Sequence, residues 1–202
     1  RNSVSTCMNP PSEPFSVAAL YRFCRLAKHE ALRPPLLDFC RRHGIKGTLL
    51  LAGEGINGTV AGSPAAIAGL VTFLEEDPRL RGLEIKYSSA AEMPFHRMKV
   101  RLKKEIVTMG VAGLDASAAG TYVEPRDWNR LAADPDTILV DTRNDYEVAL
   151  GTFDGAVDPA TATFRDFPAW AAANRERLAG RKVAMFCTGG IRCEKATAFV
   201  RS

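Results

Sequence analysis

The fold of this chain is decided by residues 182–194, which read Lys-Val-Ala-Met-Phe-Cys-Thr-Gly-Gly-Ile-Arg-Cys-Glu. Lys182 to Cys187 is a short apolar run that predicts a buried strand, and a helix is expected to begin near Ile191. Two glycines, Gly189 and Gly190, allow the backbone between them to curl so that successive N–H groups point inward. A strand, a glycine-rich turn and a helix in this order are typical of the carboxyl edge of a parallel α/β sheet, where functional residues gather.

The rest of the second half follows the same alternation of strands and helices. Thr137 to Asp141 is a compact apolar strand that ends in an acid, and Phe164 to Leu178 predicts a helix with two aromatic anchors. Such alternation predicts a parallel sheet with helices on both faces. Asp141 and Cys187 therefore both fall at the carboxyl ends of strands.

The first half has a different order of elements. We predict strands at Phe15–Phe23, Gly47–Ala52, Thr59–Ala61, Leu83–Tyr87 and Pro94–Leu102, and helices at Leu32–Arg42 and from Ser63 to about Glu76. Ser63 is an N-cap residue and Pro64 follows it at the first helical position. The order strand, helix, strand, strand, helix, strand is that of the ferredoxin-like sandwich, an α+β fold that acylphosphatase also has.

Residues Gly53 to Gly58 formally match the dinucleotide-binding pattern G-x-G-x-x-G. That site requires a helix directly after the last glycine, whereas the strand residues Thr59 to Ala61 follow here. Asn57-Gly58 is a pair typical of tight hairpin turns. We therefore predict a hairpin that turns at Asn57-Gly58, and no dinucleotide site.

Composition excludes several classes of protein. The chain has 202 residues, 46% of them hydrophobic and 25% charged, which is globular rather than disordered or collagenous. No apolar run approaches the ~18–20 residues of a membrane span, and no secretory leader is visible. The five cysteines are odd in number and scattered, and the three histidines lack metal-ligand spacing. We expect a cytoplasmic protein with no metal and no membrane contact.

The excess positive charge lies in the first part of the chain. Residues 1–125 carry 16 Lys and Arg against 12 Asp and Glu, whereas residues 126–202 carry 11 of each. A polyanionic partner is therefore expected to bind the first part. The densest run alternates cations with apolar residues, and its cations are Arg97, Lys99, Arg101, Lys103 and Lys104.

On a strand, this alternation places the cations of residues 97–103 on one face and Met98, Val100 and Leu102 on the other. Such a row could track a nucleic-acid backbone. The alternative is a solvated strand face whose lysines prevent edge-to-edge aggregation. No RNP-type aromatic motif is present, so RNA contacts would be electrostatic and shape-based.

The chain is expected to divide into four segments. These are a mobile lead-in over residues 1–14, a ferredoxin-like domain over 15–112, a linker over 113–125 and a parallel α/β domain over 126–202. The chain begins at Arg1 rather than Met and stops at Ser202 inside an expected helix. It is therefore expected to be a piece of a longer protein, with its last domain incomplete.

The loop that follows the strand carries the predicted chemistry. Inward N–H groups, the positive end of the next helix and Arg192 would lower the pKa of the Cys187 thiol, so that it is a thiolate at neutral pH. The alternative is a buried cysteine at a strand end. Cys193 is either a resolving thiol or a packing residue. We assign catalysis to Cys187 and the surrounding loop to Thr188, Gly189, Gly190, Ile191, Arg192 and Cys193.

Only four residues separate Cys187 from Arg192, and this loop resembles the active-site loop of rhodaneses, whose cysteine carries a persulfide. Asp141-Thr-Arg143, Glu147 and Gly151 to Ala156 resemble the D-x-R…E…G-x-x-x-G-A pattern of that domain. The words C-T-G-G-I-R-C-E-K, G-E-G-I-N-G and Y-V-E-P-R-D-W are narrower still. Together they resemble the tRNA uridine hydroxylase family (TrhO), whose members join a ferredoxin-like domain to a rhodanese domain.

This resemblance covers about Phe15 to Ser202 and implies oxygen-dependent hydroxylation of carbon 5 of the wobble uridine in tRNA. It implies that Cys187 is catalytic, that tRNA is the partner and that molecular oxygen is a co-substrate. Asp141, Arg143 and Lys195 are expected to support the site. No flavin, haem or iron signature is visible, so the cofactor and the electron source are left open, as is the oligomeric state.

Two alternatives to a hydroxylase are open. The first is a rhodanese-type sulfurtransferase that carries a persulfide on Cys187. The second is a non-catalytic rhodanese-like interaction module, which the intact Cys187 and Arg192 disfavour.

Overall fold

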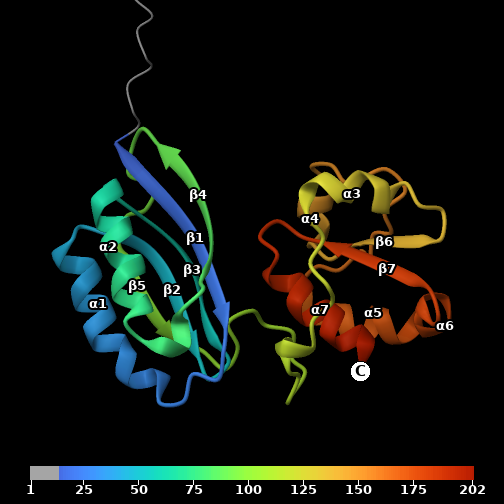
Figure 1. Ribbon diagram of the computed structural model, residues 1–202, viewed down its shortest axis with the longest axis horizontal. Coiled ribbons are helices and arrows are strands. Elements are labelled where there is room, and N and C mark those ends of the chain that lie inside the picture. Colours follow the sequence, from blue (N-terminus) through green and yellow to red (C-terminus); the bar gives the residue numbers. More distant parts are fainter. Residues whose placement is uncertain (1–13) are drawn as a thin grey trace, which may run out of the picture. The chain divides into compact units, whose positions relative to one another are not determined.

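The computed structural model describes residues 14–202, so the expected lead-in over residues 1–14 lies outside the described residues except for its last position. The chain forms two compact units that divide between Ile106 and Val107 (Figure 1). In the described part of the chain, no helix combines the length and the apolar character that crossing a membrane requires.

The first unit holds a five-stranded sheet in the order β4-β1-β3-β2-β5. Neighbouring strands are antiparallel except β2 and β5, which are parallel. The strands are β1 (Phe15–Phe23), β2 (Lys46–Ala52), β3 (Gly55–Gly62), β4 (Glu84–Ala90) and β5 (Met98–Leu102). The first four strands have the ferredoxin-like order, which confirms the predicted fold, and β5 extends the sheet at one edge.

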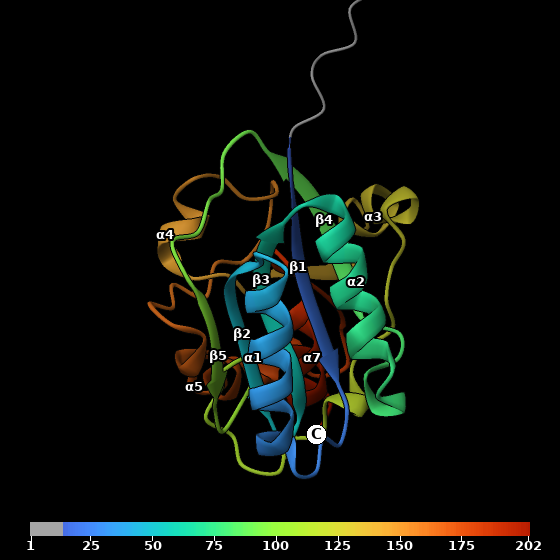
Figure 2. The same cartoon turned by 90° about the vertical axis from the view of Figure 1, so that its left-hand side faces the viewer.

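Two helices cover one face of this sheet (Figure 2). They are α1 (Arg33–Arg42), which follows the 3-10 turn η1 (His29–Leu32), and α2 (Pro64–Glu75), which precedes η2 (Pro78–Leu80). The side chain of Ser63 caps α2 by accepting a hydrogen bond from the backbone N–H of Ala66, as the sequence predicts. The core lies between the helices and the sheet and includes Leu20, Leu36, Leu49, Leu51, Ile56, Ile67, Leu70 and Val100.

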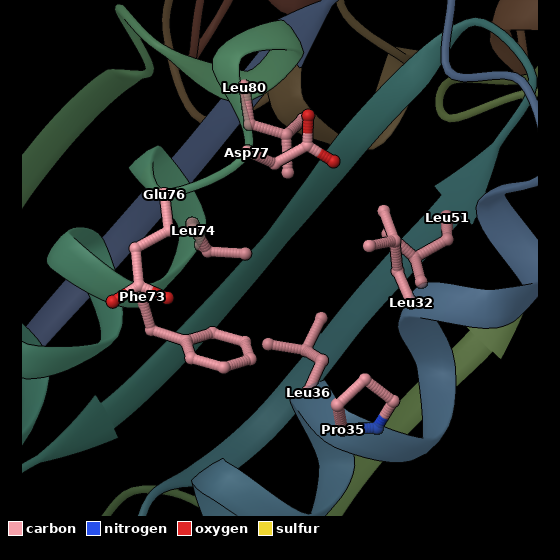
Figure 3. Close-up of a pocket in the computed structure, with 9 residues that line it drawn as sticks. All are labelled: Leu32, Pro35, Leu36, Leu51, Phe73, Leu74, Glu76, Asp77 and Leu80. Atoms are coloured by element: carbon pink, nitrogen blue, oxygen red, sulfur yellow. The ribbon is translucent and has the colours of Figure 1, made fainter.

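A cavity of about 310 Å³ lies on the helix side of the sheet in this unit (Figure 3). Apolar side chains from η1, α1, β2 and α2 line it, and Glu76 and Asp77 are its only charged lining residues. It contains neither a cysteine nor a cation, so it is not the site that the sequence predicts.

The hairpin that joins β2 to β3 turns at a different place from the predicted one. Ala52 pairs with Gly55, so the two-residue turn is Gly53-Glu54. Asn57 and Gly58 instead lie inside β3. Residues Gly53 to Gly58 belong to a hairpin, as expected, but the predicted position of its turn, at Asn57-Gly58, was wrong.

Close packing explains why Gly58 sits inside a strand. A Cβ at this position would lie 2.0 Å from the carbonyl oxygen of Thr48 on the neighbouring strand, so only glycine fits. The side chain of Asn57 is occupied as well, because its Nδ2 donates to the carbonyl oxygen of Ile106 at 2.8 Å. Tertiary contacts thus override the turn propensity of this pair.

The second unit contains a two-stranded parallel sheet of β6 (Thr137–Asp141) and β7 (Lys182–Phe186). One face packs on α5 (Phe167–Ala173) and α7 (Ile191–Arg201) through a core that includes Met109, Val140, Phe167 and Ala196. On the other face, Trp128 of α3 (Pro125–Ala132) contacts Phe186 at a ring-centroid distance of 6.0 Å. The predicted parallel strands with helices on both faces are confirmed.

Two expectations for the second unit differ from the structure. The helix expected over residues 164–178 is divided into the 3-10 turn η4 (Phe164–Asp166), α5 and α6 (Arg175–Leu178). The expected linker over residues 113–125 packs on α7, and the unit begins at Val107 rather than after residue 112. The backbone N–H of Gly120 donates to Thr197 Oγ1 at 2.8 Å, so the small residues of this segment permit close approach to the helix.

We expect Gly58→Ala to destabilise the first unit by about 2 kcal/mol or more, because the added Cβ overlaps the backbone of β2. Gly69→Ala is the matched control. Gly69 lies inside α2 with only ordinary contact around it, so alanine should be neutral or stabilising there. Urea unfolding of both variants tests this, and equal midpoints would contradict it.

Candidate active site

Cys187 directly follows β7, at the carboxyl end of the parallel sheet. The backbone N–H of Gly190 donates to Cys187 Sγ at 3.0 Å. Gly190 has a φ of +92°, in the left-handed region that favours glycine, and it turns the chain into α7. The backbone N–H groups of Arg192 and Cys193, in the first turn of α7, also help to lower the pKa of the Cys187 thiol. The predicted cradle of N–H groups is therefore present.

A second cysteine completes this cradle. The Cys193 thiol donates a hydrogen bond to Cys187, and this bond is the largest cause of a pKa for Cys187 that lies well below the usual value. Burial opposes the shift, while the two backbone N–H groups and the charge of Arg192 add to it. The same thiol–thiolate bond raises the pKa of Cys193. Cys187 is thus the thiolate and Cys193 the thiol that holds the proton.

The other described cysteines behave in the opposite way. Burial raises the pKa of Cys40 to about 12 and also raises the pKa of Cys24. Among the four cysteines of the described chain, Cys187 alone has a lowered pKa.

Glu147 fixes both ends of the loop. It lies on α4 (Asp145–Val148) and accepts hydrogen bonds from both terminal nitrogens of Arg192, at 2.5 and 2.8 Å. The Thr188 hydroxyl donates to the same carboxylate at 2.6 Å. The hydrogen bonds from Arg192, followed by that from Thr188, outweigh burial and lower the pKa of Glu147 to about 2. Arg192 is thus held in place by Glu147, and its charge also stabilises the thiolate of Cys187.

Asp141 and Arg143 fix the segment that carries Glu147. Asp141 is fully buried at the end of β6, and Arg143 donates to both of its carboxylate oxygens, at 2.9 and 2.7 Å. Thr152 donates to Asp141 at 2.8 Å, and Arg143 also donates to the Gly151 carbonyl at 2.6 Å. Burial raises the pKa of Asp141, but these hydrogen bonds outweigh it and the pKa is lowered. Both residues close the loop between residues 141 and 152, which carries Glu147.

Two residues of the site were missed by reasoning from the sequence. Glu147 was placed in a motif but was given no role, because its partners lie 41 and 45 positions away. Thr142 was not singled out at all. Its hydroxyl donates to the Phe186 carbonyl at 3.0 Å and lies 3.6 Å from Cys193 Sγ, so it ties the proton-bearing thiol to the sheet.

Lys195 lies on α7, beyond the loop that joins Cys187 to this helix. It is only 1% exposed, and its ammonium donates to the carbonyl oxygen of Val107 at 3.0 Å. It therefore anchors the start of the second unit. Within residues 14–202, no group of three or more His, Cys, Asp or Glu side chains is arranged to hold a metal ion.

The basic run is divided by the structure. Lys99 and Arg101 lie on β5, whereas Arg97, Lys103 and Lys104 lie outside this strand. Val100 is buried in the core, so Lys99 and Arg101 occupy the opposite face, as the alternation predicts. Arg97, Arg101, Lys103 and Lys104 are exposed and Lys99 is half-buried.

Comparison with known proteins agrees with these observations. Residues 15–106 match the family described as UPF0176 acylphosphatase like domain. The chain is 69% identical over 193 residues to the tRNA uridine(34) hydroxylase of Mesorhizobium japonicum, and 64% identical over 196 residues to that of Brucella suis biovar 1. The chain is a homologue of these proteins. The alignments cover 95% and 96% of this chain but 62% and 64% of the relatives, so the chain spans less than two thirds of their length.

Solved structures align with only part of the chain. An acylphosphatase from Coxiella burnetii covers 44% of it, with 11% identity and a TM-score of 0.34. The same alignment covers 94% of that acylphosphatase. This likeness is too low to support a shared function.

We expect Cys187 to be the most rapidly alkylated cysteine of residues 14–202 at neutral pH. Its rate of reaction with iodoacetamide should follow an apparent pKa below the ~8.5 of a free thiol, because the thiolate is the reactive form. Peptide mass spectrometry across a pH series measures this, with Cys24 and Cys40 as internal controls. An apparent pKa at or above that of a free thiol would contradict the thiolate assignment.

We also expect Glu147 to make the second unit sensitive to acid. Its lowered pKa means that the ionised form stabilises the fold above the ordinary Glu pKa of about 4.3, and that this stability is lost as pH falls through about 2. Glu147→Gln should remove about 1–3 kcal/mol of stability at neutral pH, after allowance for solvent screening, and should flatten the loss between about pH 4 and pH 2.

The matched control for this variant is Glu176→Gln, at an exposed position of α6. Urea midpoints at neutral and acidic pH should distinguish the two variants. If both lost stability equally on acidification, Glu147 would not be the residue that carries the effect.

Proposed function

We propose that this chain is the greater part of an enzyme that hydroxylates carbon 5 of the wobble uridine in tRNA, with Cys187 as the catalytic residue. The observation that carries the proposal is the place of the Cys187 sulfur, which follows a parallel strand, accepts a hydrogen bond from the N–H of Gly190 and has a pKa lowered chiefly by Cys193. The names of the relatives supply the substrate class. We assign Val107 to Ser202 to a rhodanese-like domain, which the Cys187 loop at the carboxyl end of a parallel sheet supports.

The thiolate suits the first step of this reaction. Carbon 5 of uracil becomes nucleophilic only after a group adds at carbon 6, and a thiolate can make that addition. A bond forms between Cys187 Sγ and carbon 6, and the electron pair of the C5=C6 bond moves onto carbon 5 and the 4-oxygen. The loop N–H groups and Arg192 then stabilise the oxyanion.

Oxygen chemistry completes the proposed reaction. One atom of O2 is added at carbon 5 and the other leaves as water, which consumes two electrons and two protons from an external two-electron reductant. The carbon 5 proton is lost and the Cys187–carbon 6 bond breaks, which restores the double bond. A cytoplasmic location follows from a tRNA substrate and a free thiolate.

tRNA is proposed to bind through the basic residues of the first unit. Its phosphates would be paired with the cations of the run that includes β5, namely Arg97, Lys99, Arg101, Lys103 and Lys104. These residues are five of the 16 Lys and Arg of residues 1–125.

A sulfurtransferase is the second candidate, because a persulfide on Cys187 would be stabilised by the same N–H groups. The two reactions leave different products. Hydroxylation adds an oxygen atom to uridine, whereas sulfur transfer replaces an oxygen atom by sulfur.

The test uses a bacterial strain that lacks 5-oxygenated wobble uridine, complemented with the protein that contains this chain. We expect nucleoside mass spectrometry to detect 5-oxygenated uridine with the unaltered protein and a loss of at least about 100-fold with Cys187→Ser. Cys24→Ser, in the first unit, is the control and should retain activity. Thiolated tRNA, detected by retardation in an organomercury gel, would favour the sulfurtransferase.

A tRNA with 5-fluorouridine at the wobble position separates the chemical routes. Addition of Cys187 at carbon 6 should leave a covalent complex that survives denaturing electrophoresis, because fluorine blocks the loss of a proton from carbon 5. Absence of this complex, with normal turnover on unmodified tRNA, would favour delivery of an atom from an oxidised Cys187.

A further inference from the structure

The face of the first unit's sheet that carries no helix has an ordered arrangement of side chains. We call it the helix-free face. Leu20, Leu49 and Val100 point into the core, so the residues that alternate with them point to the opposite side. Strand register aligns these residues in two neighbouring rows, which run across all five strands. The first row is Lys99, Thr48, Thr59, Ala19 and Lys86, and the second is Arg101, Leu50, Asn57, Tyr21 and Glu84.

The charge of the helix-free face is mainly positive. Lys99 and Arg101 lie at the β5 edge, and Lys86 lies at the β4 edge with Glu84 as the acid of these rows. The centre of the first row consists of Thr48, Thr59 and Ala19, which are small side chains. The rows therefore have cations at the edges of the sheet, and the first row has small side chains, two of them with hydroxyl groups, between those edges. This combination is complementary to a polyanion that has flat groups to lay on the sheet.

Aromatic side chains lie on the same face. Tyr21 and Phe23 are two positions apart on β1, so both belong to the helix-free face. Their ring centroids are 6.2 Å apart and their planes meet at 69°. Both residues are half-buried. Because every nucleobase has an aromatic face, rings of this kind bind unpaired bases with little dependence on sequence.

The spacing allows these groups to act on one strand of nucleic acid. Tyr21 on β1 and Arg101 on β5 are separated by three strand intervals, or about 14 Å at the usual spacing of strands in a sheet. One nucleotide does not span this distance, so the two residues would contact successive nucleotides. Four-stranded sheets of the RRM type bind single-stranded RNA in this way, with aromatic rings on the central strands.

We propose that the helix-free face binds unpaired nucleotides of RNA, with bases stacked on Tyr21 and Phe23 and phosphates paired with Lys99 and Arg101. The choice of RNA rests on the proposed function. The sequence alone predicts electrostatic contact with RNA, and this proposal adds the stacking of bases on aromatic rings. It also replaces a backbone-tracking row along one strand by a surface that runs across the sheet.

The experiment measures RNA binding by the full chain with fluorescence anisotropy. The probes are a labelled oligouridylate of about twelve nucleotides and an RNA duplex with the same number of phosphates. Tyr21→Leu should weaken binding of the oligouridylate by about 5- to 150-fold, because one stacking partner is lost. Lys99→Gln with Arg101→Gln should reduce the slope of log K against log salt by about 0.7 for each lost phosphate contact.

Tyr87→Leu is the matched control. Tyr87 is 60% exposed on β4, but it pairs with the core residue Ala18 and therefore lies on the helix side of the sheet. Its replacement should leave the affinity unchanged. Equal effects of Tyr21→Leu and Tyr87→Leu, or duplex binding as tight as that of the single strand, would overturn the proposal. Phe23→Leu provides a second test if Tyr21→Leu lowers the urea midpoint.

The result can be separated from that of the hydroxylation test. Normal hydroxylation with no effect of Tyr21→Leu on single-strand binding would overturn this inference alone. Absence of 5-oxygenated uridine in the complemented strain, together with the expected effect of Tyr21→Leu on single-strand binding, would overturn the proposed function alone.

Discussion

The carboxylate of Glu147 is the interaction on which the candidate active site depends. It holds Arg192 and Thr188 at once, so the loop between Cys187 and α7 has a fixed shape. The ion pair is largely shielded, with side chains only 14% and 15% exposed, and removal of one partner would leave an uncompensated charge. The pair also fixes the position of Arg192, whose charge helps to lower the pKa of Cys187. Cys187 is stabilised chiefly by hydrogen bonds from neutral donors, and its sulfur is therefore available for reaction.

A chain of short contacts links this carboxylate to the sheet. The register of β6 and β7 places Asp141 opposite Phe186, the residue before Cys187. Asp141 holds Arg143 and Thr152, which close the segment that carries Glu147. Together these contacts connect the end of β6 to the loop that holds the Cys187 sulfur. The buried acid at the end of β6 is thus a positioning residue.

The parts predicted from the sequence are those that local chemistry determines. β1 and β6 were predicted with their observed bounds, because apolar residues predominate in each. Cys187 and Arg192 were found because their spacing in one loop indicates their chemistry. Glu147 and Thr142 act across more than 40 positions, and neither has a sequence pattern that indicates a partner. The Asn57-Gly58 turn failed for the same reason, since neighbouring strands decide where a hairpin turns. Strand register likewise places Tyr21 on the face of Lys99, and the sequence alone does not show that two residues so far apart share a face.

Three motif residues outside the loop between Cys187 and Arg192 form hydrogen bonds to the backbone at the end of the first unit and at the start of the second. Ile106 ends the first unit, and the hairpin holds it on both sides: Glu54 accepts from its N–H at 2.7 Å and Asn57 donates to its carbonyl at 2.8 Å. Val107 begins the second unit, and Lys195 donates to its carbonyl oxygen. A buried ammonium is costly unless it is hydrogen-bonded, so a lysine at this position is better explained by anchoring the backbone than by solvent exposure. The motif G-E-G-I-N-G therefore anchors Ile106, the last residue of the first unit. The lysine of C-E-K anchors Val107, the first residue of the second unit.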